Sequence, residues 1–237
     1  MRKALLFLLV LGLVALPLVA AAEMWVGGQI GGNFVNDTDI DITSGANRLN
    51  LHSVKIQPSV IGGLQIGYNF VKEGFLGYNY PDWMKYFSFA IDFTYNRLDI
   101  NSQEVNGVFN GVPFTRLRLP KIEGYAATLG FLFIGKYGFL PDSEVPFGRL
   151  VPYLGVGPAI LFSGINGMGV EKSSTDICLL VESGLKYYAL KNVSLDAAFR
   201  YRYAQPSYNV SFAGAAASLD VDAAHQFSFL FRANYHF

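Results

Sequence analysis

The last segment of the chain, residues 226–237, alternates apolar and polar side chains. Its odd positions hold Phe227, Phe229, Phe231, Ala233, Tyr235 and Phe237. Its even positions hold Gln226, Ser228, Leu230, Arg232, Asn234 and His236, of which only Leu230 is apolar. Successive side chains of a β-strand point to opposite sides, so this segment predicts a strand with one aromatic face and one polar face. A strand that faces lipid on one side and the polar interior of a closed barrel on the other has this pattern.

The beginning of the chain has the pattern of a secretory signal peptide. The basic residues Arg2 and Lys3 precede an apolar run over residues 4–18, and small residues follow up to Ala22. The apolar run is shorter than the roughly 20 residues that a membrane-spanning helix needs. We therefore expect a cleaved signal peptide at residues 1–22 and a barrel domain at residues 23–237.

The charge balance and the cysteine content bear on nucleic-acid binding and on disulfide formation. Without Arg2 and Lys3, the 18 basic side chains fall to 16 against 18 acidic ones, and this near-neutral balance gives no support for binding nucleic acid. The lone Cys178 cannot form an internal disulfide, and we expect it to fill space inside the barrel. We expect no cofactor.

The same alternation predicts eight strands, at residues 24–35, 54–70, 86–96, 124–134, 151–163, 177–188, 193–203 and 226–237. One face of every segment carries no charge, whereas the opposite faces carry Lys55, Asp92, Glu182, Lys186, Asp196, Arg200, Arg202 and Arg232. A charge facing the middle of a bilayer costs roughly 2–4 kcal/mol, which excludes charge from the lipid face alone. Closure pairs every backbone group, as a sheet that crosses lipid requires. The sequence therefore predicts an all-β fold, an eight-stranded antiparallel transmembrane β-barrel with up-and-down meander topology.

The even number of strands places both ends of the domain on the periplasmic side. Residues 36–53, 97–123, 164–176 and 204–225 are then expected to form extracellular loops, with some strands continuing beyond the bilayer. Residues 71–85, 135–150 and 189–192 are expected to form periplasmic turns, and the first two are longer than is usual for such turns. Since proline cannot donate a ladder hydrogen bond, we expect a bulge or local break at Pro158.

Aromatic residues cluster near the segment ends, where the interface girdles of a barrel belong. The expected periplasmic rim consists of Trp25, Tyr68, Phe70, Phe87, Phe133, Tyr187, Tyr235 and Phe237. The expected outer rim consists of Phe34, Tyr95, Tyr125, Tyr201, Tyr203 and Phe227.

Several stretches resemble those of a known family. The ending Tyr235-His236-Phe237 resembles the assembly signal of bacterial outer-membrane barrels. The stretches Val151-Pro152-Tyr153-Leu154-Gly155-Val156-Gly157-Pro158, Gly184-Leu185-Lys186-Tyr187-Tyr188 and Phe199-Arg200-Tyr201-Arg202-Tyr203 resemble the OmpA-like outer-membrane β-barrel superfamily. The resemblance implies a location in the outer membrane of a Gram-negative bacterium. Since the predicted strands run to the last residue, we expect no peptidoglycan-binding domain after the barrel.

The resemblance also implies partners. They are outer-membrane lipids, lipopolysaccharide and the outer-membrane assembly machinery, which would read a C-terminal signal made of Phe229, Phe231, Tyr235 and Phe237. We expect no nucleic-acid partner and a monomer rather than an oligomer.

The predicted barrel interior contains an ion-pair network of Asp92, Glu182, Lys186, Asp196, Arg200 and Arg232. Asp92, Glu182, Arg200 and Arg232 fall at similar heights along their strands, and Lys186 and Asp196 fall in a lower layer. An eight-stranded barrel is just wide enough for side chains to fill it, so we interpret these charges as an ion-paired plug. A gated or narrow conducting path is the alternative.

Candidate catalytic and metal sites are weak. His225 and Ser228 differ in parity and point to opposite faces, and the His-x-Ser-Asn motif of the lipid A deacylases is absent. A loop set of His52, Asp99 and Ser102 is similar to the triad of the lipid A palmitoyltransferases only in being carried by loops. The alternating Asp37, Asp39 and Asp41 lack the spacing of an EF-hand and predict a solvated acidic loop.

These patterns favour a non-enzymatic outer-membrane barrel with a structural or surface-interaction role carried by its extracellular loops. The alternatives are a channel for small solutes or hydrophobic compounds, a lipid A-modifying enzyme, and a soluble secreted barrel of the lipocalin kind.

Overall fold

The computed structural model describes residues 24–70, 80–167, 170–212 and 215–237. The expected signal peptide at residues 1–22 lies outside these ranges. No helix in the described part of the chain is long and apolar enough to cross a membrane.

Eight antiparallel strands close into a barrel in the order β1-β14-β11-β10-β9-β8-β5-β4. They are β1 (Met24–Val35), β4 (Ser59–Asn69), β5 (Phe87–Arg97), β8 (Glu123–Lys136), β9 (Leu150–Gly167), β10 (Val170–Leu190), β11 (Val193–Ala204) and β14 (Ala224–His236). The first strand closes the barrel by pairing with both β4 and β14. The predicted eight-stranded antiparallel barrel is confirmed.

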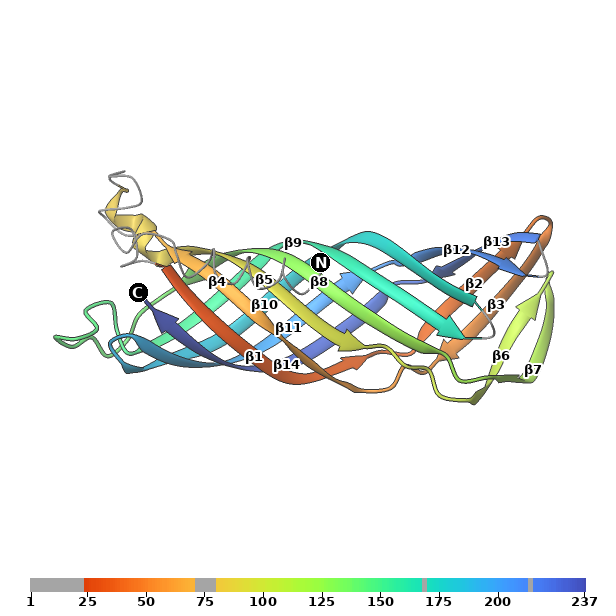
Figure 1. Ribbon diagram of the computed structural model, residues 1–237, viewed down its shortest axis with the longest axis horizontal. Helices are drawn as coiled ribbons and strands as arrows, with labels where there is room; N and C mark the ends of the chain where they lie inside the picture. Colours follow the sequence, from red (N-terminus) through yellow and green to blue (C-terminus); the bar gives the residue numbers. More distant parts are fainter. Residues whose placement is uncertain (1–23, 71–79, 168–169, 213–214) are drawn as a thin grey trace, which may run out of the picture.

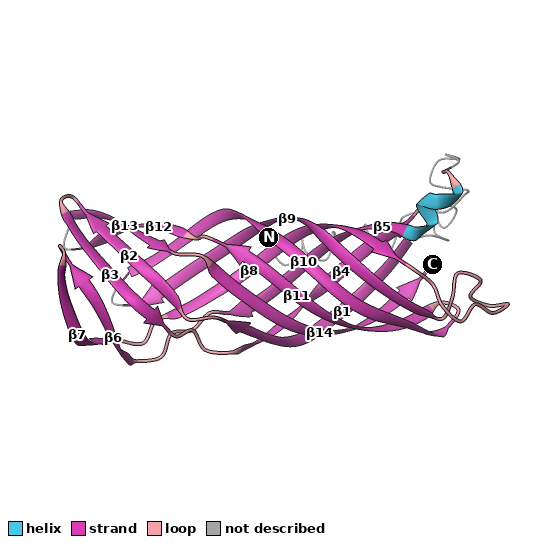
Figure 2. Ribbon diagram, turned by 180° about the vertical axis from the view of Figure 1, so that it is seen from behind, coloured by secondary structure: helices cyan, strands magenta, loops and turns pink. Residues whose placement is uncertain are grey.

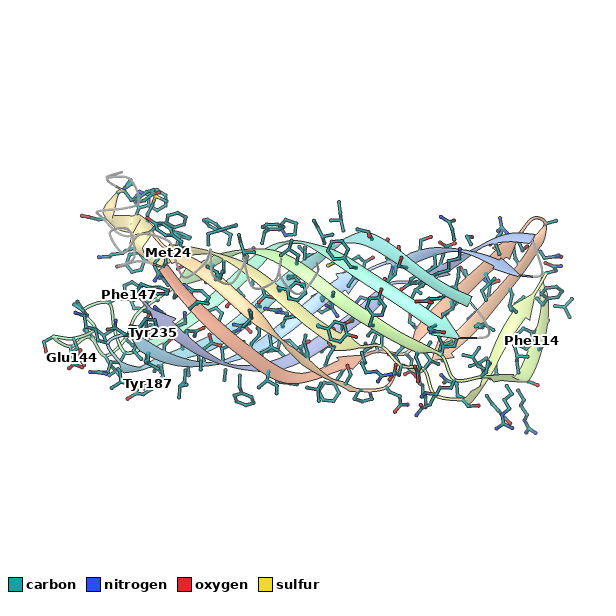
Figure 3. All side chains as sticks on the ribbon, viewed as in Figure 1. Met24, Phe114, Glu144, Phe147, Tyr187 and Tyr235 are labelled. Carbon is teal, nitrogen blue, oxygen red and sulfur yellow. The ribbon has the colours of Figure 1, made fainter. Side chains whose placement is uncertain are left out.

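Both ends of the barrel chain lie at the same end of the molecule, which we call the terminal end (Figures 1 and 3). There Trp25 of β1 pairs with His236 of β14. We call the opposite end the far end.

The two faces of the barrel wall differ as the alternation predicts. Outward-facing side chains are apolar and exposed. Ile30, Ile177 and Phe231, for example, are 62%, 83% and 66% exposed. Inward-facing polar and charged side chains are buried, with Asp92 and Arg200 at 0% and 2%. The wall therefore presents hydrocarbon outward and encloses charge.

The expected break at Pro158 is confirmed in the β8–β9 ladder. Pairing runs from the far end as far as Gly130 opposite Ala159 and resumes at Phe133 opposite Val156 in the same register. Proline has no amide proton to donate, so the ladder loses two pairs there without forming a bulge.

The far end corrects the expectation of loops at residues 36–53, 97–123 and 204–225. These connections form three hairpins that pair into a six-stranded sheet, β12-β13-β2-β3-β6-β7. Its strands are β2 (Thr38–Ser44), β3 (Asn47–Val54), β6 (Gln103–Phe109), β7 (Val112–Leu119), β12 (Ser207–Phe212) and β13 (Ala215–Val221). The sheet continues the long axis of the barrel (Figures 1 and 2). Between residues 164 and 176, β9 and β10 likewise extend as paired strands.

Local sequence explains the far-end hairpins. The run Thr38-Asp39-Ile40-Asp41-Ile42 alternates β-branched and acidic residues, and Ile40 is buried. The β6–β7 hairpin turns at Asn110 and Gly111, both with positive φ (48° and 84°), which is the preferred pair for a two-residue hairpin turn.

The six-stranded sheet has an apolar core of its own. Its buried members are Ile40, Leu51, Val54, Ile100, Val105, Leu119, Tyr208, Ala217 and Leu219. Val54 was expected on the lipid face at the start of the second barrel strand. It instead ends β3 and is completely buried in this core, because β4 begins only at Ser59.

The long turn at residues 135–150 is folded rather than open. Asp142 accepts hydrogen bonds from the backbone N–H groups of Val145 and Glu144 and from the guanidinium of Arg149. These donors, with the Val145 N–H foremost, hold the pKa of the Asp142 carboxyl below its usual range. Of the other long turn, residues 80–85 are described, and the 3₁₀ helix Asp82–Tyr86 ends it.

The aromatic rims face outward except for one residue. Tyr95, Phe133 and Tyr187 are 48–50% exposed on the outer wall. Trp25 was expected at the rim but lies inside the barrel with 2% exposure. Gly67 leaves the room for it, since a Cβ at Gly67 would lie 2.2 Å from the indole ring.

Candidate functional site

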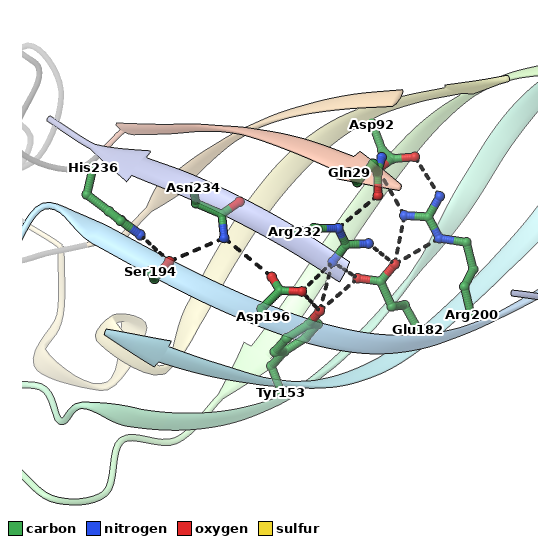
Figure 4. Close-up of polar contacts among 10 residues, drawn as sticks. All are labelled: Gln29, Asp92, Tyr153, Glu182, Ser194, Asp196, Arg200, Arg232, Asn234 and His236. Carbon is green, nitrogen blue, oxygen red and sulfur yellow. Dashed lines mark hydrogen bonds and ion pairs between the residues drawn. The ribbon is translucent and has the colours of Figure 1, made fainter. Parts of the chain in front are cut away.

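An ion-paired cluster crosses the barrel interior, and Arg200 of β11 lies at one edge of it (Figure 4). The Arg200 guanidinium donates to both carboxylate oxygens of Asp92, at 2.7 and 2.9 Å, and through Nε to Glu182 at 2.8 Å. All three side chains are at most 2% exposed. The two terminal nitrogens of an arginine guanidinium can donate two parallel hydrogen bonds to one carboxylate. Such a contact neutralises the charge of Asp92 and also fixes the orientation of the two side chains.

A second guanidinium extends the cluster toward the terminal end. Arg232 of β14 donates to the two oxygens of Glu182 at 2.7 and 2.6 Å. Its Nε donates to the amide oxygen of Gln29 at 2.8 Å, and Nη1 contacts the Tyr153 hydroxyl at 2.8 Å and Asp196 at 3.4 Å. Glu182 thus joins the two arginines.

The strand register brings these opposite charges together. Glu182 stands directly opposite Arg200 in the β10–β11 ladder, and Asp196 stands opposite Arg232 in the β11–β14 ladder. Because directly opposed side chains on one face lie about 4.5–5.5 Å apart, each ladder presets one ion pair. Asp92 reaches the cluster from across the lumen, on β5.

Lys186, which was predicted to belong to the network, lies apart from this cluster. It pairs with Asp196 in the β10–β11 ladder, yet its ammonium lies 4.4 Å from the centre of the Trp25 ring. Among the described residues, Lys186 makes no ion pair with a carboxylate.

Toward the far end, the buried arginine of the interior has uncharged hydrogen-bond partners. Arg202 is 4% exposed and donates to the neutral oxygens of Thr128, Asn96 and Gln226. Further buried side chains in this half are polar and uncharged, among them Asn33, Thr94, Ser163 and Ser228, and they lie among buried apolar residues such as Ala126, Leu161, Cys178, Leu180 and Ala204. Cys178 has the filler position expected of it.

Two members of the cluster were not predicted from the sequence. They are Gln29, which donates to Asp92 at 2.6 Å, and Tyr153, which contacts both Glu182 and Arg232. Parity alone places Gln29 and Tyr153 on the inner face. A search of inward positions for neutral polar side chains would therefore have found them.

The whole barrel domain matches a known family. Residues 6–237 match the family described as the outer membrane protein beta-barrel domain. The chain belongs to this family.

Two solved structures with TM-scores above 0.5 share its fold, and a third is similar at a lower score. Neisserial surface protein A is 16% identical with a TM-score of 0.52, and the match covers 90% of this chain and 97% of that one. OprG from Pseudomonas aeruginosa is 13% identical with a TM-score of 0.52, covering 92% and 98%. The N-terminal barrel domain of OprF from the same organism is 10% identical with a TM-score of 0.45, covering 92% and 99%. No curated protein sequence matches the chain.

The loop residues considered for catalysis have separate partners. The His52 ring contacts Asp39 at 3.0 Å, whereas Asp99 pairs with Arg97 at 2.9 Å. Ser102 is contacted by a different side chain, the Arg118 guanidinium, at 3.5 Å. The three residues therefore form no hydrogen-bonded triad.

The acidic stretch at residues 37–41 carries internal contacts. Asp39 contacts His52 and accepts from the backbone N–H of Ser53, and these two bonds, His52 first, lower the pKa of its carboxyl. Asp41 accepts a hydrogen bond from Asn50. In the described ranges no group of three or more His, Cys, Asp or Glu side chains could hold a metal ion.

The four residues of the expected C-terminal signal share the outer face of β14 and the residue after it. Phe229, Phe231, Tyr235 and Phe237 are 48–66% exposed. Together with Ala233, these side chains line the outer apolar face of the last strand.

Proposed function

We propose that the protein is an integral outer-membrane protein of a Gram-negative bacterium that acts through surface interactions of its far-end sheet. In this proposal residues 1–22 direct export and are removed, the terminal end faces the periplasm and the far end faces outward. The described wall contacts outer-membrane lipid and lipopolysaccharide, and the protein works as a monomer.

The observation that carries the proposal is the six-stranded far-end sheet. A barrel needs no such extension to cross a bilayer, and this one has its own buried core. The β6–β7 hairpin exposes apolar side chains, with Phe109, Val112 and Leu117 at 48%, 67% and 42%. Arg116 and Arg118 are exposed beside them. Exposed apolar groups bordered by charge are typical of a protein-interaction surface.

The interior supports a surface role over conduction. Arg200 and Arg232 tie three carboxylates across the lumen. The cavity beside them has a volume of about 20 Å³, which is space for roughly one water. A barrel filled in this way resists the passage of solutes.

We also propose that the outer-membrane assembly machinery recognises Phe229, Phe231, Tyr235 and Phe237. The support is their shared position on one exposed face of the last strand, where the pairing of β14 with β1 closes the barrel.

Surface adhesion of whole bacteria tests the proposal. Cells expressing the wild-type protein should adhere to host-matrix proteins or to one another, and Phe109→Ser with Leu117→Ser should remove this gain. Leu140→Ser is the matched control, since Leu140 is 66% exposed at the terminal end. Folding of each variant is checked by its shifted migration on gels without heating.

Conductance measurements in planar bilayers distinguish a surface-interaction role from a channel. The purified wild-type barrel should give no discrete conductance steps. Discrete steps that change when Arg200 or Arg232 is neutralised would instead establish the channel alternative. Equal adhesion of hairpin and control variants would remove the surface role.

A further inference from the structure

A small cavity lies inside the barrel near the terminal end. Its volume is about 20 Å³, and its border includes Trp25, Gln65, Ser88, Lys136 and Lys186. Since roughly 10–15 Å³ suffices for one water, the space fits about one water or a single monatomic ion.

Two side chains on this border have buried donors without partners. They are the indole Nε1 of Trp25 and the amide Nε2 of Gln65, which lack a hydrogen-bond partner among the described residues. The residues are only 2% and 1% exposed. Buried polar groups are nearly always satisfied in native proteins. Both atoms are donors, so the species that satisfies them must be an acceptor.

The charges around the cavity also call for an anion. Lys136, Lys186 and Arg232 border it, against a single carboxylate on that border, Asp196. Asp196 already accepts from Arg232. Neither lysine has an ion pair with a carboxylate within the described ranges. Two ammonium groups around one cavity repel each other, and an anion between them relieves this repulsion.

The hydrogen-bond and ring partners of the two lysines carry no negative charge, and Asp196, which stands opposite Lys186 in the ladder, is shared with Arg232. The Lys136 ammonium donates to the neutral amide oxygen of Asn69 and lies 5.2 Å from the Phe147 ring centre. Lys186 lies over the Trp25 ring. Ring faces and amide oxygens orient a cation but carry no negative charge.

We propose that this cavity is a binding site for a small monovalent anion of the size of chloride. Such an ion accepts hydrogen bonds from Trp25 and Gln65 and balances the ammonium groups of Lys136 and Lys186. A water molecule would satisfy the two donors without balancing charge, and the volume is too small for sulfate or phosphate. The site is independent of the far-end sheet on which the proposed function rests.

Bromide serves as the probe, because it matches chloride in charge and quenches indole emission on contact. The chain has two tryptophans, and the second, Trp83, is 60% exposed at the terminal end. In the Trp83→Phe protein, Trp25 is the sole emitter. Sodium bromide is titrated at constant ionic strength against sodium gluconate, whose anion exceeds the cavity. We expect saturable quenching of Trp25.

Adding Lys186→Met should weaken the apparent bromide affinity at least tenfold. Lys172→Met is the matched control and should leave the titration unchanged, since Lys172 is exposed at the far end. Quenching that rises linearly with bromide and is equal in all variants would overturn the proposal.

Diffraction from the unsubstituted protein crystallised with bromide gives a test that needs no variant to fold. We expect an anomalous peak within hydrogen-bond distance of Trp25 Nε1 and Gln65 Nε2. Density without anomalous signal at that position, which indicates water alone, would overturn the anion site while leaving the surface function untouched.

Discussion

The Asp92–Arg200 pair gives the sharpest energetic prediction. Arg200→Met removes two charge-assisted bonds to Asp92 and one to Glu182. It leaves the Asp92 carboxylate buried, with Gln29 as its one remaining side-chain donor among the described residues. Removing one partner of a buried ion pair typically costs about 3–5 kcal/mol. We expect the free energy of unfolding to fall by that amount.

The double variant isolates the pair. Asp92→Asn with Arg200→Met removes the uncompensated charge, and Glu182 keeps its bonds to Arg232. The double variant should therefore lose less stability than the sum of the single variants, with a coupling on the order of 1–3 kcal/mol. Urea unfolding in lipid vesicles, followed by tryptophan emission, measures all four proteins.

An exposed ion pair serves as the control. Arg97 contacts Asp99 at 2.9 Å, but its side chain is 55% exposed, and exposed pairs contribute about 0–1 kcal/mol. Arg97→Met should therefore be nearly neutral. If Arg200→Met costs no more than Arg97→Met, the interior charges are solvated and the account of a closed, ion-paired lumen is refuted.

Two further predictions concern the wall and the far end. Phe231→Arg should destabilise the barrel in vesicles by roughly 2–4 kcal/mol, because it places a charge on the lipid face. Val112 at the far end is equally exposed, and Val112→Arg should leave the stability unchanged. If both substitutions lower the free energy of unfolding equally, Phe231 and Val112 are both in lipid or both in water. The lowered pKa of Asp39 means that its bonds to His52 and Ser53 stabilise the β2–β3 hairpin above the unfolded pKa near 3.8. This stability is lost as pH falls through the still lower folded value. Proteolysis of the hairpin should therefore rise on acidification, and less so in Asp39→Asn; an equal rise in both would assign the effect to other groups.

The barrel was predictable because membrane and strand geometry act on every second residue. Charge is excluded from one face of each strand, so parity alone assigned Asp92, Glu182, Arg200 and Arg232 to the interior. The contacts among them depend on register and on distance across the lumen. Only the assembled ladders fix those quantities, as the Gln29 and Tyr153 contacts show.

The far-end sheet was missed for a different reason. Its pairings join hairpins far apart in the chain, such as Asp220 of β13 with Asp41 of β2. Like charges directly opposite each other destabilise a strand pair. Nothing in the sequence of either hairpin therefore indicates that these two strands pair. The stretch at residues 38–42 alternates like a strand, but its acidic residues were interpreted as a solvated loop.

Trp25 shows how two rules can conflict. An aromatic residue near a strand end suggests an interface girdle, whereas its odd position on β1 places it on the inner face with Gln29. Parity prevailed because Gly67, on the neighbouring strand, provides space for the ring inside the barrel.

The medium on each side of the wall can be measured with spin labels. With Cys178 replaced by alanine, single cysteines at Leu64, Ile91 and Phe231 on the outer wall, and at Val112 on the far-end sheet, would each carry a label in reconstituted vesicles. If hydrocarbon surrounds the wall, oxygen should relax the three wall labels more strongly than a water-soluble nickel complex does, and the nickel complex should relax the label at residue 112 more strongly. Wall labels relaxed mainly by the nickel complex would show that water, not hydrocarbon, surrounds the uncharged face.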